Sequence, residues 1–183
     1  MSNKAFVDLG ISQETVAILS KKGYETPTKI QAALIPEFFN SSQDIIAKAD
    51  TGTGKTGAFG IPLIDTIDTN QKGVHAIAIA PTRELASQVA KELSIYKGRR
   101  AIDIIELCGG QGMKQQIDQL KRMKRASIVV GTPGRILDHL NKKRLKLQQI
   151  SFLIIDEVDE MLNFGFKEDM DAIVEKTNPK YLK

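Results

Sequence analysis

The sequence predicts an α/β fold, in which a mostly parallel β-sheet carries helices on both of its faces. Short continuous runs of Ile, Val, Leu and Ala alternate with longer segments of helical periodicity. Two of these runs lead directly into polar motifs, one rich in glycine and one acidic. Continuous apolar runs are typical of strands that are buried on both faces. Ligands of such sheets bind at the carboxyl ends of strands, where both motifs lie.

The expected elements follow one another along the whole chain. The first 43 residues are expected to be helical: Ser12 caps a helix that ends near Gly23, and a second helix starts after Pro27. Strands are expected at residues 44–48, 75–80, 102–107, 127–131 and 151–155. Further helices are expected at residues 55–68, 83–97, 112–124, 133–142 and 168–176.

Length and composition indicate one soluble globular domain. The chain has 183 residues, of which 42% are hydrophobic and 26% charged. No apolar run approaches the length of a membrane span, and the N-terminus lacks the apolar core of a signal peptide. The single cysteine, Cys108, excludes an internal disulfide and favours a reducing compartment, so a cytoplasmic location is expected. We interpret Cys108 as a small hydrophobe at the edge of the core.

Charge is distributed unevenly along the chain. The net charge is +4, yet residues 97–146 hold 13 Lys and Arg against 4 Asp and Glu. A solvated charge run is the usual explanation for such clustering. Here the excess spans three expected strand–helix units, which also fits a basic face that binds a polyanion such as nucleic acid.

A glycine-rich segment follows the apolar residues of the first expected strand. Its glycines would let the backbone curl, so that successive N–H groups point at one anion. Lys55 would then reach the β- and γ-phosphates of a nucleotide, the Thr56 hydroxyl would bind Mg²⁺, and the start of the next helix would add positive potential. The segment consists of Ala49, Asp50, Thr51, Gly52, Thr53, Gly54, Lys55 and Thr56.

Two carboxylates, Asp156 and Glu157, directly follow the last expected strand. Acids at a helix start are also favoured by the helix dipole alone. Together with the glycine-rich segment upstream, however, they favour a Mg-nucleotide hydrolase. Asp156 would hold the metal through water, and Glu157 would orient the attacking water.

Three further segments after strands are suited to phosphate groups. Thr132 and Pro133 are typical of a helix start, whose free N–H groups bind anions. Glycine pairs allow nucleic acid to approach the backbone closely. Contacts of this kind do not depend on base sequence. Arg83 and Arg135 could instead pair with acids of the same domain. These three segments consist of Pro81, Thr82, Arg83, Gly109, Gly110, Thr132, Pro133, Gly134 and Arg135.

From about Phe6 onward the chain resembles the N-terminal core domain of the DEAD-box RNA helicases. The resemblance depends on six motifs in the family's order, at residues 23–31, 49–56, 81–86, 109–110, 132–135 and 156–159. Two positions are unusual. Ala49 replaces the Gly of the strict phosphate-loop pattern, which the family tolerates, and Val158 replaces the family's usual Ala, which adds bulk but no chemistry.

The resemblance implies a RecA-like P-loop NTPase domain, a three-layer sandwich that uses ATP and Mg²⁺. It also implies that the three phosphate-suited segments named above bind RNA. Residues 1–43 would form a helical lead-in with the Q motif, and residues 44–183 the P-loop core. The Q motif places Tyr24, Lys29 and Gln31 at the nucleotide: Tyr24 would pack on adenine, and the Gln31 amide would recognise its N7 and N6 edge. Without the family, Tyr24 would be interpreted as a core aromatic and Gln31 as a solvated helix residue.

The resemblance also implies that parts of the family's catalytic core lie outside this sequence. In the family a strand with a Ser-Ala-Thr motif follows the acidic motif, and a second helicase domain supplies arginines to the γ-phosphate; this chain ends at Lys183, before both. A gap in the sheet, an exposed apolar surface or a partner that fills the gap is expected. The parent protein is expected to be an ATP-dependent RNA helicase. The 183-residue chain is expected to be nearly inactive, because an external arginine can account for about 10³–10⁵ of the rate.

The sequence also allows two alternative functions. The first is a DNA helicase or translocase with the same core. The second is a non-enzymatic module that only binds ATP or RNA. A nucleotide kinase would explain neither the basic stretch nor the phosphate sites at two helix starts.

Overall fold

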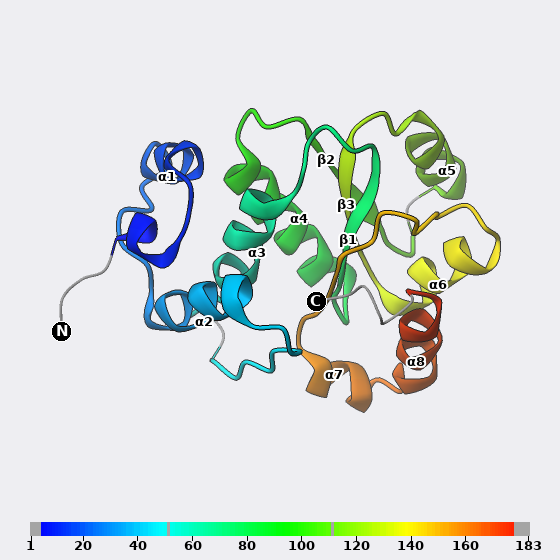
Figure 1. The fold of residues 1–183 in the computed structure, drawn as a ribbon. Coiled ribbons are helices and arrows are strands. Elements are labelled where there is room, and N and C mark those ends of the chain that lie inside the picture. Colours follow the sequence, from blue (N-terminus) through cyan, green and yellow to red (C-terminus); the bar gives the residue numbers. More distant parts are fainter. Residues whose placement is uncertain (1–4, 51, 111, 178–183) are drawn as a thin grey trace. The chain divides into compact units, whose positions relative to one another are not determined.

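A computed structural model describes residues 5–50, 52–110 and 112–177 of the chain (Figure 1). Thr51 of the expected phosphate loop therefore lies outside the described residues. None of the described helices is both long and apolar enough to span a bilayer. The elements are η1 (Phe6–Leu9), α1 (Gln13–Ser20), α2 (Lys29–Asn40), α3 (Lys55–Thr66), β1 (Gly73–Ile79), α4 (Arg83–Lys97), β2 (Ile102–Leu107), α5 (Met113–Arg122), β3 (Ala126–Gly131), α6 (Pro133–Asn141), β4 (Phe152–Ile155), α7 (Val158–Asn163) and α8 (Lys167–Lys176).

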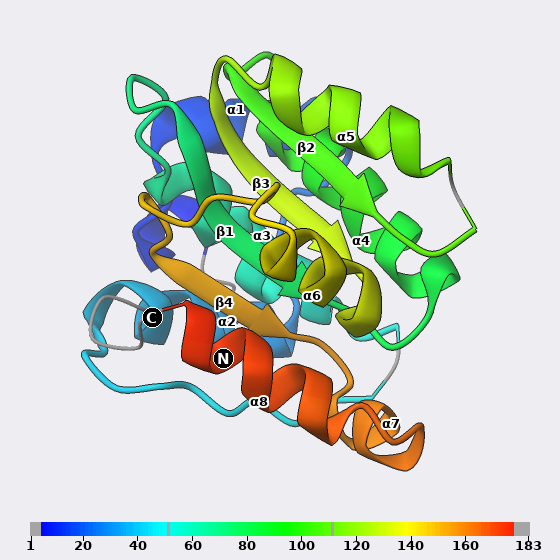
Figure 2. The ribbon, with the colours of Figure 1, turned by 90° about the vertical axis from the view of Figure 1, so that its right-hand side faces the viewer.

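The strands form one parallel sheet in the order β2-β3-β1-β4 (Figure 2). The register aligns their carboxyl ends, because Gly131 of β3 pairs with both Leu107 of β2 and Ile79 of β1. Ile79 in turn pairs with Ile155 of β4. The segments that follow these four strands therefore begin at one edge of the sheet, the edge at which such folds bind their ligands.

Burial along the strands agrees with a sheet that is covered on both faces. Every residue of β3 is buried, and so is every residue of β1 after Gly73. Side chains from α5, α6 and α8 cover one face, and Figure 2 shows these helices lying across it. The shared core comprises Val74, Ile77, Ile79, Ile105, Leu107, Leu120, Val129, Ile136, Leu140, Leu145, Ile150, Met161, Met170 and Ile173.

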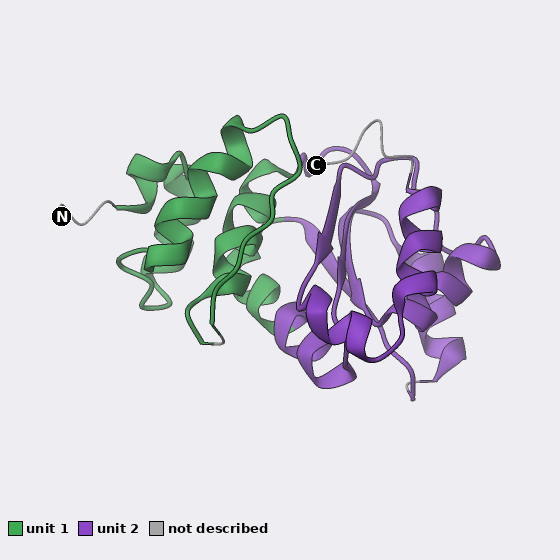
Figure 3. Ribbon diagram, turned by 90° about the horizontal axis from the view of Figure 1, so that it is seen from below, with its two compact units in different colours: residues 1–67, 91–100 green, residues 68–90, 101–183 purple. Residues whose placement is uncertain are grey.

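The chain forms two compact units (Figure 3). Unit 1 contains residues 1–67 and 91–100, and unit 2 contains residues 68–90 and 101–183. Unit 1 holds the helical lead-in and the glycine-rich segment. Unit 2 holds the sheet, the acidic pair and the three segments that are expected to bind RNA.

Within unit 1, Asp65 near the end of α3 joins distant parts of the chain. Its carboxylate accepts hydrogen bonds from the hydroxyls of Ser12 and Thr15 and forms an ion pair with Arg100. Ser12 also caps α1 as expected, since its hydroxyl accepts from the backbone N–H of Thr15. These bonds fix the helical lead-in to the helix that follows the glycine-rich segment.

The prediction of a strand at residues 44–48 is wrong. Residues 43–50 form neither helix nor strand, and the side chains of Ile45 and Ile46 are 40% and 97% exposed. A strand requires a neighbour for its backbone N–H and C=O groups. The strand order β2-β3-β1-β4 includes no partner for residues 44–48 among the described residues. The two isoleucines therefore form an exposed apolar surface.

Candidate functional site

The glycine-rich segment curls as its composition predicts. Gly52 and Gly54 adopt φ values of +78° and +93°, in the left-handed region that favours glycine. Gly54 is the N-cap of α3, so Lys55 and Thr56 occupy the first helical turn. Because the first N–H groups of a helix lack intrahelical partners, this turn can bind an anion.

The residues that precede these glycines close the loop. Ala49 is half-buried and Asp50 is exposed. The Thr53 hydroxyl donates a hydrogen bond of 2.6 Å to the Asp50 carbonyl. Lys55 and Thr56 are half-buried, so their side chains remain accessible to a ligand.

Gln31 joins residues 23–31, here called the Q segment, to this loop. Its amide nitrogen donates to the Gly54 carbonyl at 3.1 Å, and its amide oxygen accepts from the Thr28 N–H at 3.0 Å. Gln31 is 4% exposed, so its interpretation as a solvated helix residue is wrong. Lys29, the first residue of α2, is exposed.

Tyr24 packs in unit 1 against a second, buried tyrosine. The rings of Tyr24 and Tyr96 meet edge to face, with 5.6 Å between their centroids. The Tyr96 hydroxyl donates to Glu92 at 2.9 Å. Burial raises the pKa of Tyr96 well above its usual value, and the charge of Glu92 raises it further. Tyr96 is therefore a neutral support for Tyr24, which itself is half-buried.

In unit 2 the acidic pair lies directly after β4. The backbone N–H of Asp156 donates to the Ile79 carbonyl at 2.9 Å, which extends the sheet pairing by one residue. Glu157 then adopts a φ of +54° as the N-cap of α7. The left-handed conformation costs a residue other than glycine about 1–2 kcal/mol. Strain of this kind clusters at functional sites.

Two of the segments expected to bind RNA are in direct contact. Arg83, the exposed first residue of α4, donates from Nη1 to the Gly109 carbonyl at 3.0 Å. A Cβ on Gly110 would overlap the Arg83 guanidinium. The glycine at position 110 therefore gives Arg83 room to lie across the loop. Pro81 is buried, and the Thr82 hydroxyl accepts from Leu85 N–H at the start of α4.

The third segment opens α6 as expected. Thr132 is the N-cap, although its side chain makes no capping hydrogen bond, and Pro133 occupies the first turn. Gly134 is exposed. Arg135 donates from Nη1 to the Gln116 side-chain oxygen on α5 at 2.9 Å.

Within the described part of the chain, the oxygens that hold Arg83 and Arg135 are thus uncharged. A carbonyl and an amide oxygen fix the guanidinium groups without neutralising their charge. The ion pairs in the described part of the chain join other side chains: Arg100 with Asp65, Lys142 and Arg144 with Asp138, and Lys167 with Asp171.

Cys108 is buried at the end of β2, as its interpretation as a core-edge hydrophobe predicts. Burial raises the pKa of its thiol to about 12, and the nearby Glu106 contributes to the rise. Because a thiolate is the reactive form of cysteine, Cys108 is not a nucleophile near neutral pH.

Only part of the basic stretch, residues 97–146, lies at the edge of the sheet where ligands bind. Lys121, Arg122, Lys124 and Arg125 lie at the end of α5 and directly before β3. Residues that precede a parallel strand lie at the edge opposite to the one where ligands bind. Arg135, in contrast, follows β3. Charge count alone therefore does not locate the site.

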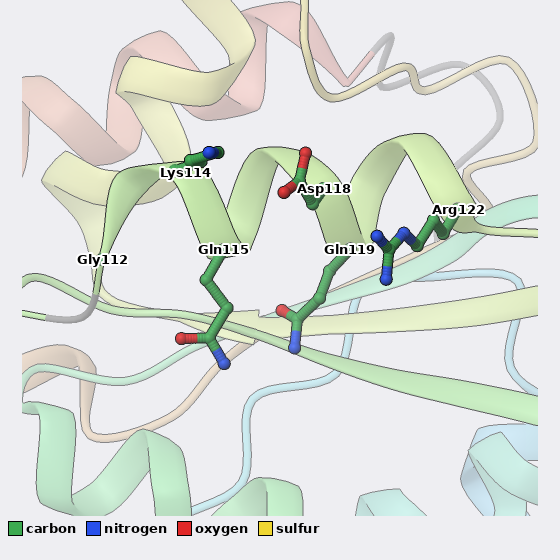
Figure 4. A pocket seen from close by; sticks show the side chains of 6 residues that line it. All are labelled: Gly112, Lys114, Gln115, Asp118, Gln119 and Arg122. Carbon is green, nitrogen blue, oxygen red and sulfur yellow. The ribbon is translucent and has the colours of Figure 1, made fainter.

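A shallow hollow runs along the solvent side of α5 (Figure 4). Its polar side chains project from successive turns of the helix. None of the residues expected to bind nucleotide or RNA lines it. The lining residues are Gly112, Lys114, Gln115, Asp118, Gln119 and Arg122.

Gln116 and His139 belong to none of the segments expected to bind nucleotide or RNA, yet a hydrogen bond joins Gln116 to Arg135. His139 is fully buried, and its Nε2 lies 3.0 Å from the Gln116 side-chain oxygen. Burial lowers the pKa of His139, and the positive charge of Arg144 adds to this. Gln116 lies four residues before the apolar Leu120 on α5, a spacing that would have placed it on the inner face of the helix.

The parallel sheet and the curled glycine loop that opens α3 define an α/β domain of the phosphate-loop class. The chain belongs to the DEAD/DEAH box helicase family, whose model matches residues 28–182. It is 48% identical over 169 residues to the DEAD-box ATP-dependent RNA helicase CshA of Bacillus cereus, covering 92% of this chain and 32% of that protein. It is 46% identical over 173 residues to a probable ATP-dependent RNA helicase of Methanocaldococcus jannaschii, covering 94% of this chain and 46% of that protein.

Solved structures agree with this assignment. The crystal structure of a DEAD box protein from Methanococcus jannaschii matches with a TM-score of 0.88 and 45% identity, over 95% of this chain and 47% of that one. Saccharomyces cerevisiae Dbp5 bound to RNA and ADP BeF3 matches with a TM-score of 0.83 and 28% identity, over 94% and 43%. The chain thus spans 32% and 46% of the length of the two helicases named above.

Proposed function

We propose that this chain is the ATP- and RNA-binding domain of a longer, cytoplasmic ATP-dependent RNA helicase that unwinds or remodels RNA. Membership of the helicase family supports the class of activity. The observation that carries the nucleotide part is the left-handed backbone at Gly52 and Gly54, directly before Lys55. Such a loop has N–H groups that converge on a phosphate.

In this proposal, the loop at Lys55 binds a Mg-bound triphosphate, and the acidic pair acts on its metal ion and on the attacking water. Lys55 binds the β- and γ-phosphates, while Thr56 and, through water, Asp156 hold Mg²⁺. A hydroxyl and a carboxylate suit this hard cation. The proposed site differs from a metal site built from protein side chains alone, because the described residues contain no cluster of three or more acidic, His or Cys side chains that could bind a metal. Bound Mg²⁺ would neutralise charge on the phosphates.

Glu157 and the Q segment supply the other nucleotide contacts. The Glu157 carboxylate orients and polarises the attacking water. Tyr24 packs on the adenine ring, and Lys29 contributes beside it. Gln31 keeps one amide hydrogen and one lone pair free after its bonds to Gly54 and Thr28, so it can still recognise the edge of adenine.

RNA is bound through its backbone at the segments after β1, β2 and β3. Arg83, Gly109 and Arg135 lie there with both positive charges uncompensated by the oxygens that hold them. Phosphate and 2′-hydroxyl contacts of this kind do not read base sequence. A second helicase domain in the longer protein would supply the remaining arginines and the other part of the RNA grip.

A Lys55→Ala variant tests the nucleotide site. It should abolish binding of a fluorescent ATP analogue with Mg²⁺ and leave RNA affinity at low salt unchanged. Retained nucleotide binding would contradict the proposal. With saturating RNA, the 183-residue chain should show little steady-state ATPase activity; turnover of about 1 s⁻¹ or more, as in intact enzymes, would contradict the need for a second domain.

Competition between matched single-stranded RNA and DNA tests the nucleic-acid partner. RNA should compete better, because contacts to the 2′-hydroxyl are available only from RNA. Equal competition by DNA would instead favour a DNA helicase or translocase.

A further inference from the structure

Gln116 is a buried glutamine that connects the segments expected to bind RNA in unit 2. It is 1% exposed and lies in the first half of α5. Its amide nitrogen donates to the Cys108 carbonyl at 2.8 Å. Its amide oxygen accepts from Arg135 Nη1 at 2.9 Å and lies 3.0 Å from His139 Nε2.

These three contacts fix the orientation of the Gln116 amide. The guanidinium of Arg135 can only donate, and the Cys108 carbonyl can only accept. A flipped amide would place its NH₂ against Arg135 and its oxygen against the carbonyl. His139 must then carry its proton on Nε2, which agrees with a buried Nδ1 that has no hydrogen-bond partner in the described structure.

Gln116 is linked to one of the three segments directly, at Arg135, and to the other two through Cys108. Cys108 directly precedes Gly109, whose carbonyl accepts from Arg83. Gln116 therefore holds the base of the glycine loop with one end of its amide and Arg135 with the other. An arginine side chain has many rotamers, and holding it in one of them removes an entropy cost from binding.

We propose that Gln116 is a positioning residue for RNA, which holds the Arg135 guanidinium in the arrangement that binds the backbone. This inference depends on the proposed RNA function. Gln116 is buried and touches RNA only through these partners. The competing explanation is that Gln116 merely satisfies the buried His139.

A double-mutant cycle separates the two explanations. Gln116→Met keeps the length of the side chain and removes its hydrogen bonds, and Arg135→Ala removes the charged group itself. With the 183-residue chain and a short labelled oligouridine at low salt, we expect each variant to weaken binding by about three- to tenfold. The double variant should bind no more weakly than Arg135→Ala, because Gln116 acts through Arg135. Additive losses would overturn the proposal.

His139→Gln is the matched control. It removes the buried imidazole but leaves Arg135 with its glutamine partner, so RNA affinity should change less than twofold. A loss equal to that of Gln116→Met would instead support the explanation based on His139. Nucleotide affinity should be unchanged in every variant.

A measurement on the free chain keeps this inference distinct from the proposed function. NMR relaxation of the Arg135 Nε–H group should report an ordered side chain in the parent chain and a mobile one in Gln116→Met. Equal order in both would overturn the inference even if RNA binds. If the parent chain binds no RNA at low salt, the proposed RNA function fails, while the NMR result still decides whether Gln116 positions Arg135. Should Gln116→Met not fold, Gln116→Asn, which is too short to reach both partners, replaces it.

Discussion

The side-chain amide of Gln31 donates a hydrogen bond to the carbonyl oxygen of Gly54, 3.1 Å away. Gly54 is the N-cap of α3, and its carbonyl also accepts the first helical hydrogen bond, from Ala58. The other end of the Gln31 amide accepts from Thr28, so the start of α2 is fixed to the glycine loop. A change at Gln31 should therefore weaken the binding of a nucleotide's phosphates as well as of its base.

Gln31→Met should weaken nucleotide binding without unfolding the chain. Methionine preserves volume but loses two hydrogen bonds, each worth about 1 kcal/mol. We expect about a tenfold loss of affinity for an ATP analogue in a fluorescence titration, which corresponds to about 1.4 kcal/mol. Gln13→Met, at an exposed glutamine that begins α1, should have no effect. Unchanged affinity in Gln31→Met would show that Gln31 does not couple the start of α2 to the glycine loop.

Gly57→Ala should disturb the same coupling from the opposite side. A Cβ at Gly57 would lie 2.5 Å from Gln31 Nε2, so the amide must move. A Cβ at Gly60 would instead meet Leu93 at 2.8 Å. Both alanine variants should lower the free energy of unfolding by about 1–3 kcal/mol in denaturant titrations. Only Gly57→Ala should also reduce nucleotide affinity, and an equal reduction in Gly60→Ala would contradict this assignment.

Gly110→Ala should displace Arg83 and weaken RNA binding. The new Cβ would overlap the guanidinium, and the φ of +80° adds backbone strain. Gly165→Ala provides the matched control, because its φ is +79° but no other atom lies within 4 Å of the added Cβ. Both variants should lose about 1 kcal/mol of stability, whereas only Gly110→Ala should lose about three- to tenfold in RNA affinity, measured by anisotropy. Similar RNA affinity in the two variants would show that Arg83 does not depend on this glycine.

Glu157→Gly should stabilise the chain. Glu157 and Lys143 adopt positive φ values of +54° and +52°, which glycine tolerates without strain. Glu157→Gly and Lys143→Gly should each raise the free energy of unfolding by up to about 1 kcal/mol. The greater entropy of glycine in the unfolded chain offsets part of the gain. Thermal melts measure both. Only Glu157→Gly should abolish ATP hydrolysis in the longer protein; if both variants retain hydrolysis, Glu157 does not orient the water.

His139 should make stability depend on pH. Its pKa lies below the usual value of 6.5 because of burial and the charges of Arg144, Arg135 and Lys142, which Asp138 opposes. The unfolded chain therefore binds a proton at a higher pH than the folded chain does. This stabilisation is complete above pH 6.5 and is lost as the pH falls below it.

A comparison of thermal melts at about pH 7.5 and about pH 5.5 tests this dependence on either side of the ordinary histidine pKa. The parent chain should lose more stability on acidification than His139→Gln, which cannot titrate at that position. Parallel losses in the two proteins would assign the pH dependence to other groups.

Much of the fold could be predicted because its strands are locally encoded. The apolar run at residues 102–107 and the helical periodicity at residues 83–97 both matched the structure in full. The strand expected at residues 44–48 is equally apolar, yet it does not form. Pairing depends on a neighbour in space, and sequence pattern alone cannot supply that neighbour. The short α7 was missed because six residues carry too little periodicity.

For the site, the motifs located the loops but not the side chains that support them. The curled glycines and the helix start at Pro133 follow from backbone preferences that a local sequence contains. The contact of Gln116 with Arg135 joins two helices, and the sequence of neither helix predicts it. The roles of Lys55, Asp156 and Glu157 remain predictions; Lys55→Ala tests the first and Glu157→Gly the last.

Ile46 carries a consequence for handling the protein. Burial of an isoleucine side chain contributes about 1.5–3 kcal/mol, and at 97% exposure Ile46 forgoes almost all of it. The adjacent Ile45 adds to the same water-facing surface. Concentrated solutions of this chain should therefore self-associate through these residues, and Ile46→Lys should keep the protein monodisperse in light scattering.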